Sequence, residues 1–88
     1  MSRIKGDRVG AVLSADGTTV KLLGYGTYEG EEIPPRGFFH KAGVSNPKIQ
    51  LDNGNIVWGY QCWWASEEKV KEMIGNRNVI PATIDGEG

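Results

Sequence analysis

The stretch that decides the fold is Asp7-Arg8-Val9-Gly10-Ala11-Val12-Leu13-Ser14, then Ala15-Asp16-Gly17-Thr18, then Thr19-Val20-Lys21-Leu22-Leu23. An Asp-Gly pair between apolar runs is typical of a β-hairpin with a type I′ turn, whose two central residues have positive φ. That turn places Leu13 opposite Val20 and Ala11 opposite Leu22. One side of the hairpin is then wholly apolar, and we expect it to face the core.

The other side of this hairpin is too apolar for a surface that meets only water. It carries Val12 and Leu23 beside two cations and an aromatic ring, with Arg8 predicted opposite Tyr25. An exposed patch of this kind needs a cover. The cover is the chain's own helix, a second subunit or a ligand, and the sequence leaves the three alternatives open.

A second hairpin is predicted from Lys48 to Trp58, with Asn53-Gly54 as its turn. In that register Ile49 faces Trp58 and Leu51 faces Ile56. The period-two alternation of a strand then puts Tyr60, Cys62 and Trp64 on the core side and leaves Trp63 exposed. A single bulge at Gly59 would reverse every assignment after it.

The connection between the two hairpins, residues 26–47, is rich in Gly and Pro. Pro34 and Pro35 exclude a helix interior and a central strand. A connection this long in a small domain is uncommon and often functional. We expect a short helical turn or an edge strand near Phe38-Phe39, with burial of the two rings as the simplest reason for their presence.

One helix is predicted after Trp64. Ser66 is suited to cap it, and Val70, Met73 and Ile74 form one apolar stripe before Gly75 ends it. Residues 79–84 read as a closing edge strand that tolerates Pro81. The fold class is therefore mainly β (α+β). We expect a small, bent antiparallel barrel or sheet, SH3-like in scale, of about five strands with one C-terminal helix.

Composition bounds the functional classes. The 88 residues suit one domain, expected over residues 1–84, with 85–88 as a frayed tail. Ten Lys+Arg against eleven Asp+Glu give a net charge of -1, without the basic footprint of a DNA or RNA binder. No apolar run reaches the roughly 18–20 residues of a membrane span, and no signal peptide is evident. We expect a cytoplasmic protein with no membrane, DNA or RNA partner.

Catalytic and cofactor motifs are weak. The glycines of residues 24–30 are not followed by a helix pattern, so we interpret them as bends in a strand rather than as a phosphate-binding loop. Cys62 and His40 are too few for a four-ligand zinc site, and nothing brings them together as nucleophile and base. We predict no cofactor, no metal and no enzymatic activity, and keep a weak hydrolase using Cys62 as a third hypothesis.

Aromatic rings and cations remain as candidates for binding. Rings stack on nucleobases, while Arg and Lys pair with phosphates. Trp58 and Trp64 are predicted in the core. The predicted ligand-binding residues are those that combine these two chemistries: Arg8, Tyr25, Tyr28, Arg36, Lys41, Lys48 and Trp63.

The chain also resembles a group of small uncharacterised phage and prophage proteins. The resemblance covers residues 6–74 and rests on Gly6-Asp7-Arg8-Val9-Gly10-Ala11-Val12-Leu13-Ser14, Leu23-Gly24-Tyr25-Gly26, Asn46-Pro47-Lys48-Ile49, Val57-Trp58-Gly59 and Cys62-Trp63-Trp64. Small phage proteins include oligomeric sponges that sequester cyclic oligonucleotides or NAD-derived signals of bacterial defence systems such as CBASS and Thoeris. By that analogy the chain would act in the cytoplasm of a host cell.

Two functions follow as expectations. The first is a non-catalytic homo-oligomer that sequesters a small anionic nucleotide immune signal and so blocks host defence. The second is a protein–protein inhibitor or adaptor that binds a bacterial partner protein through an aromatic face and the Pro34-Pro35 loop.

Overall fold

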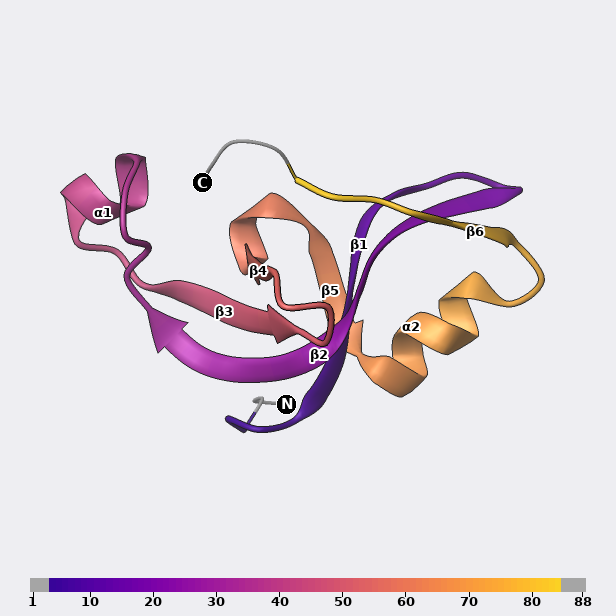
Figure 1. Cartoon of the computed structure of the whole chain (residues 1–88), viewed down its shortest axis with the longest axis horizontal. Coiled ribbons are helices and arrows are strands. Elements are labelled where there is room, and N and C mark those ends of the chain that lie inside the picture. Colours follow the sequence, from indigo (N-terminus) through magenta and orange to yellow (C-terminus); the bar gives the residue numbers. More distant parts are fainter. Residues whose placement is uncertain (1–3, 85–88) are drawn as a thin grey trace.

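The computed structural model describes residues 4–84, and these form one open sheet with two helices (Figure 1). The strand order is β4-β3-β2-β1-β5, and β6 pairs in parallel with the first part of β2. The mainly β class is confirmed, but the sheet does not close into a barrel. The elements are β1 (Arg8–Ala15), β2 (Thr19–Glu32), α1 (Phe38–Ala42), β3 (Asn46–Leu51), β4 (Ile56–Trp58), a 3-10 turn η1 (Gly59–Gln61), β5 (Trp63–Ser66), α2 (Glu67–Ile74) and β6 (Asn78–Pro81).

The β1–β2 hairpin forms where predicted, but its turn and register differ from the prediction. Neither Asp16 nor Gly17 has a positive φ. Instead the Asp16 carboxylate accepts hydrogen bonds from the backbone N–H groups of Thr18 and Thr19, so the side chain closes the turn. Arg8 consequently lies opposite Thr27 rather than Tyr25.

Two irregularities then reverse the predicted faces of Leu13 and Leu23, while Val9 and Ala11 face the core as predicted. The pairing Ala11–Gly24 is followed by Val12–Leu22 and Ser14–Lys21, which leaves Leu23 and Leu13 as extra residues, one in each strand. A bulge changes the side to which a side chain points. Leu23 is therefore buried in the core, whereas Leu13, predicted in the core, is 40% exposed.

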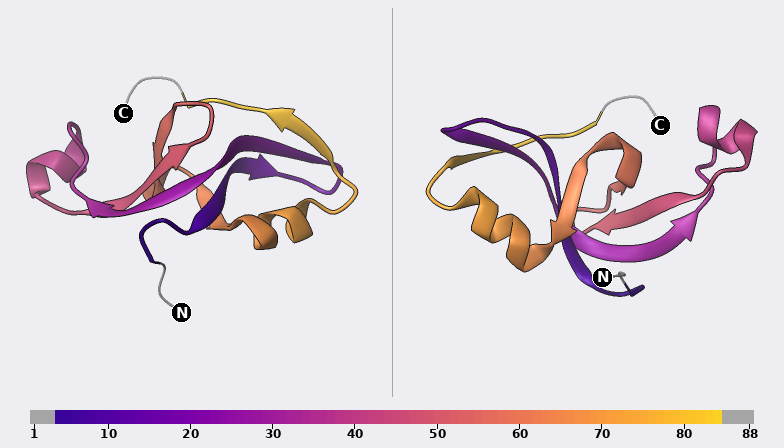
Figure 2. Two further views of the ribbon diagram at one scale, coloured as in Figure 1. Left: turned by 60° about the horizontal axis from the view of Figure 1, so that its bottom comes forward. Right: turned by 180° about the vertical axis from the view of Figure 1, so that it is seen from behind.

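The core consists of two clusters, one on each face of the β1–β2 ribbon. The larger contains Val9, Ala11, Leu23, Tyr28, Ile49, Leu51 and Val57. The smaller contains Val12, Val20, Ala65 and Val70, and Val70 is fully buried. Helix α2 supplies Val70 and lies against β1, β5 and β2 (Figure 2). The face predicted to need a cover is thus covered by the chain's own helix.

The β3–β4 hairpin has a register one residue away from the predicted one. Ile49 pairs with Val57, and Gln50 with Ile56. Gly54 has φ 97°, and the Leu51 N–H donates to the Asn55 carbonyl across a three-residue loop. Val57 is therefore buried and Ile56 is 46% exposed, the reverse of the prediction.

The segment expected to be irregular is more ordered than its composition suggests. Strand β2 continues to Glu32, and the short helical turn predicted near Phe38 is α1. Gly26 pairs with Leu51 of β3, and the two strands approach so closely there that a Cβ would collide with the Gln50 carbonyl oxygen. This supports the interpretation of the glycines as features of a bent strand.

The molecule is elongated, about 40 × 28 × 21 Å, with α1 at one end and the β1–β2 turn and α2 towards the other (Figure 1). Neither helix of the described chain has the length and apolar character needed to cross a membrane. The predicted tail, residues 85–88, lies outside the described residues.

Candidate functional site

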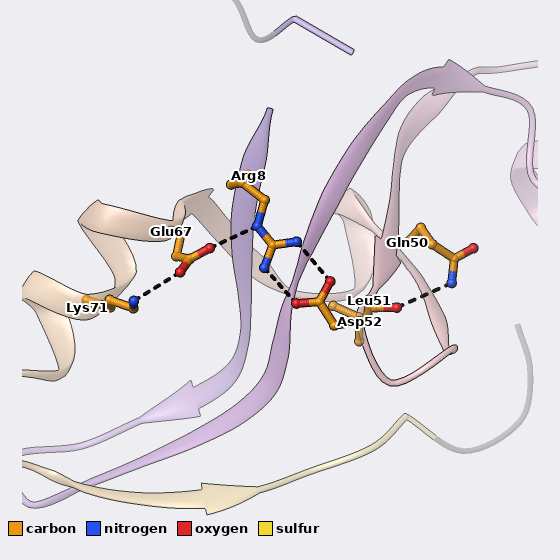
Figure 3. Close-up of polar contacts among 6 residues, drawn as sticks. All are labelled: Arg8, Gln50, Leu51, Asp52, Glu67 and Lys71. Atoms are coloured by element: carbon orange, nitrogen blue, oxygen red, sulfur yellow. Dashed lines mark hydrogen bonds and ion pairs between the residues drawn. The ribbon is translucent and has the colours of Figure 1, made fainter. Parts of the chain in front are cut away.

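Arg8, a predicted phosphate ligand, is the centre of an ion-pair network between three elements (Figure 3). Its guanidinium donates two hydrogen bonds to Asp52, at 2.8 and 2.6 Å, and one to Glu67 at 3.0 Å. Glu67 also pairs with Lys71 at 3.0 Å. In the same view Gln50 donates to the Leu51 carbonyl beside Asp52. Two cations and two carboxylates cancel, so this network joins β1, the β3–β4 loop and α2 without leaving a net positive charge.

The network changes the acidity of its carboxyl groups. The Arg8 guanidinium holds the pKa of Asp52 below its usual range, and Lys71 together with Arg8 does the same for Glu67. Both carboxyls are therefore ionised at neutral pH and keep their hold on Arg8. A phosphate would have to displace them. The Tyr25 ring lies beside this network, 5.5 Å from the Lys71 ammonium.

Tyr28 is a core residue. Its ring stacks on Trp64 with centroids 5.4 Å apart. The residue belongs to the larger core cluster and is only 7% exposed. The hydroxyl donates to the Glu31 carboxylate at 2.9 Å. Burial, with Glu31 as the second cause, raises the pKa of Tyr28. The ring has no face available to stack on a ligand.

Arg36 and Lys48 are the two predicted cations that the structure brings to one place. Both line a shallow pocket of about 330 Å³ with Trp58 and Ile56. Lys48 pairs with Glu32 at 3.2 Å, which offsets one of the two charges. Trp58, predicted in the core, is 7% exposed.

The most exposed aromatic group of the described chain lies on α1 and η1. The rings of Phe38 and Phe39 meet edge to face at 5.3 Å, and Phe39 packs on Tyr60 at 4.7 Å. Phe38 is 75% exposed and Tyr60 43%. We call Phe38, Phe39 and Tyr60 the aromatic surface. The burial expected for Phe38 and Tyr60 is wrong, whereas Phe39 is partly buried.

Local contacts hold α1 in place although none of its residues is buried. Gly37 and Gly43 have φ of 88° and 69° at its two ends, which permits the sharp entry and exit of the chain. The His40 Nδ1 hydrogen bonds to the Pro34 carbonyl at 3.0 Å. Lys41 lies on this helix and Arg36 just before it, and neither forms a salt bridge with any residue of the described range.

Trp63 is exposed, as predicted, at 48%. It borders a groove of about 300 Å³, which we call the β1 groove. Its lining is mostly apolar, with Ser14 and Arg77 as the polar members: Val12, Leu13, Ser14, Ala15, Trp63, Met73 and Arg77. Trp63 thus lies in different surroundings from the other predicted ligand-binding residues.

Within one chain, the seven predicted residues do not form a single site. Arg8 and Tyr25 lie at the ion-pair network, Arg36 and Lys48 at the shallow pocket, Lys41 on α1, Trp63 at the β1 groove and Tyr28 in the core. The sequence reasoning missed the aromatic surface. Two consecutive phenylalanines in a loop bounded by Pro35, Gly37 and Gly43 were the available signal, since such a loop offers little to pack against.

The Cys62 and His40 side chains hydrogen bond to different backbone carbonyls. The Cys62 thiol donates to the Trp58 carbonyl, and His40 bonds to Pro34. Burial raises the pKa of Cys62 to about 11, so the thiol is protonated at neutral pH and is a poor nucleophile. Among residues 4–84, no group of three His, Cys, Asp or Glu side chains is arranged to hold a metal ion.

No family model, curated protein or solved structure matches the chain. The resemblance to small phage proteins therefore stays a prediction.

Proposed function

We propose that the protein is a non-catalytic binding module that docks an acidic partner protein on the aromatic surface of α1. The observation that carries this proposal is that α1 holds two phenylalanines and buries none of its residues. Helices this short are not stable by themselves in water. The core of this chain does not require α1, so a contact outside the chain is the better reason for its two rings.

The residue types suit a protein partner. A few large rings supply most of the binding energy in typical protein interfaces, because they remove much apolar area from water at a low entropy cost. Phe39 packs between Phe38 and Tyr60, so the three rings form one continuous surface. Their mutual contacts reduce the freedom that each side chain would lose on binding.

The charges near the aromatic surface select the partner. Arg36 and Lys41 have no salt bridge within the described residues, in contrast to Arg8, Lys48 and Lys71. Unpaired cations beside apolar rings favour a partner whose rim is acidic, because complementary charge speeds association and disfavours other partners. The edge-to-face arrangement of Phe38 and Phe39 is less suited to a nucleobase, which needs a flat ring face on which to stack.

The test places a photo-crosslinking phenylalanine analogue at position 38, with the same analogue at exposed Val79 as the matched control. We expect one protein to be crosslinked from position 38 and not from position 79 in cells that encode the chain. That protein, purified, should bind one-to-one by calorimetry. Phe38→Ala should weaken binding at least tenfold, and Arg36→Gln should reduce its salt dependence.

Two results would contradict the proposal. One is equal crosslinking from both positions. The other is binding of the purified candidate that is unchanged by Phe38→Ala while circular dichroism shows both proteins folded.

A second candidate is sequestration of a small anionic nucleotide by a homo-oligomer, supported by the pocket that Arg36 and Lys48 share with Trp58. Calorimetry with a panel of cyclic dinucleotides and ADP-ribose tests it directly. Saturable binding that is lost in Lys48→Gln and retained in Phe38→Ala would favour this candidate over the first. An absence of heat and of thermal shift across the panel would remove it.

A further inference from the structure

The β1 strand extends beyond its neighbour on one side. Strand β5 pairs with β1 from Val9–Ser66 to Val12–Trp63, and there β5 begins. Strand β1 continues to Ala15, paired only with β2 (Figure 1). Among the described residues, Leu13–Ala15 therefore have a strand on one side and none on the other. Backbone groups on such an edge are ready to pair with another chain.

The surroundings of this edge are mostly apolar, and Arg77 is the charged residue of the groove lining. The β1 groove runs beside Leu13–Ala15, and its rim includes Trp63 at 48% and Leu13 at 40% exposure. Leu13 is exposed because it is the extra residue of the irregular pairing between Val12 and Ser14. Exposed Trp and Leu side chains beside an unpaired strand edge are typical of an interaction surface.

Strand β6, by comparison, carries a feature that discourages pairing. It also exposes apolar side chains, Val79 and Ile80, each near 45%. It ends, however, in Pro81, which lacks the N–H that a neighbouring strand would need. Leu13–Ala15 contain neither a proline nor a charge, two of the devices by which proteins protect their edges.

We propose that the β1 groove is the contact between two copies of this chain, which pair their Leu13–Ala15 edges antiparallel about a two-fold axis through Ser14. Ser14 then lies opposite the partner subunit's Ser14, and Leu13 opposite the partner subunit's Ala15. The contact is isologous, so one surface satisfies both copies. The three unpaired residues of each edge match in length, because β5 blocks pairing beyond Val12 on either side.

The same register supplies a complementary polar contact. The partner subunit's Val12 would lie opposite Asp16, which places the partner subunit's Trp63 beside the turn of the first copy. Arg77 lines the groove and also a neighbouring pocket with Gly17 and Thr18, so it lies near this turn. Its guanidinium contacts the Met73 sulfur at 3.4 Å and has no salt bridge with a described residue. A cation on an indole ring is a favourable pair.

The whole-chain charge permits a second copy at this edge. With a net charge of -1, two copies repel each other little. The two-fold axis stands perpendicular to the sheet, so each copy's α2 stays on the same face of the joined sheet and each Arg77 faces the partner subunit's Trp63. This contact lies at the opposite end of the molecule from the aromatic surface, so the two proposals succeed or fail separately (Figure 1).

The test is a disulfide across the two-fold axis. In a Cys62→Ala background, Ser14→Cys should form a disulfide-linked dimer in nearly all molecules under mild oxidation, because Cα atoms of directly paired residues are about 4.5–5.5 Å apart. Thr18→Cys, in the exposed turn, is the matched control and should form no disulfide-linked dimer. Light scattering of the wild-type chain should give twice the monomer mass.

Two substitutions distinguish this specific contact from non-specific association through exposed apolar side chains. Leu13→Asp should shift the wild-type dimer to the monomer mass, whereas Ile80→Asp, at a similarly exposed apolar position, should leave it dimeric. Arg77→Gln should raise the dimer dissociation constant severalfold while circular dichroism stays unchanged. A monomeric wild type at all concentrations, equal crosslinking of the two cysteine variants, or a different polypeptide species found on this edge would overturn the proposal.

Discussion

The two helices of this protein differ in what they do for the fold. Helix α2 is capped by Ser66, whose side chain accepts the Lys69 N–H, and it buries Val70 completely. Its Glu67 binds Arg8 and Lys71. Helix α1 has no side-chain cap and no buried residue, and the Lys41 it carries has no salt bridge to a described residue.

This difference separates stability from recognition. In α2, Val70 is buried and Glu67 is paired with Arg8 and Lys71, so a ligand would have to break existing contacts to use them. In α1, Phe38 is exposed and Lys41 has no salt bridge with a described residue, and for this reason we propose that the helix contacts another molecule. A small domain with a thin core can include one helix that does not stabilise it, provided that the other elements cover both faces of the sheet.

The largest effect is expected from the fully buried residue of α2. Val70→Ala should lower the free energy of unfolding by about 2 kcal/mol, through lost apolar contact and the remaining cavity beside Val12 and Val20. Urea denaturation followed by circular dichroism measures it. If the free energy of unfolding falls no more than it does for a substitution at an exposed position, then α2 does not close the second cluster.

The next effect concerns the start of α2. Ser66→Ala should lower the free energy of unfolding by about 1 kcal/mol, because the N–H of Lys69 loses its acceptor. Ser66→Asp, which restores an acceptor, should recover most of the loss in the same urea titration. If both variants lose the same free energy of unfolding, the loss does not come from the missing cap hydrogen bond.

The ion-pair network should make stability depend on pH. The folded-state pKa values of Asp52 and Glu67 lie below those of the unfolded chain, so their contribution is present above about pH 4 and is lost as the pH falls through the folded values. Arg8→Gln should therefore have a lower free energy of unfolding than the wild type at pH 7. This difference should disappear in acid and become smaller in 1 M salt.

The matched control for the network is Lys69→Gln, which removes a charge of α2 that forms no salt bridge with a described residue. Its stability relative to the wild type should stay constant between pH 7 and pH 3. A gap for Arg8→Gln that persists unchanged in acid would show that packing of the arginine stem, not the ion pairs, is responsible.

The smallest effect is expected at α1. Phe38→Ala should change the free energy of unfolding by no more than about 0.5 kcal/mol, since the ring is 75% exposed. The same substitution should weaken binding of the acidic partner at least tenfold. A loss of stability comparable to that of Val70→Ala would remove the distinction between the two helices.

Much of the fold could be predicted because local signals agree with it. The Ser66 cap and the stripe of Val70, Met73 and Ile74 located α2, and glycine turns located both hairpins. The pairing registers could not be predicted. A side-chain hydrogen bond of Asp16 replaced the expected turn, and two bulges reversed Leu13 and Leu23, events that depend on packing between strands.

The candidate site was harder to predict than the fold. Residue type alone selected Arg8 and Tyr28 as ligands, yet the carboxylates that hold Arg8 come from Asp52 and Glu67, far along the chain. The Tyr28 ring stacks on Trp64, and its hydroxyl donates a hydrogen bond to Glu31. Whether a cation or a ring is available depends on such distant partners, and the spacing of residues in sequence does not reveal them.

The sequence by itself determined a mainly β chain, the place of its capped helix and the absence of a basic footprint, because each follows from local periodicity or composition. Only the tertiary structure decided that α2 covers the second face of the hairpin, that Arg8 is neutralised and that Phe38, Phe39 and Tyr60 gather at one exposed end. The physical reason is that burial and ion pairing join residues distant in the chain, and register, which a single bulge shifts, decides which of them meet.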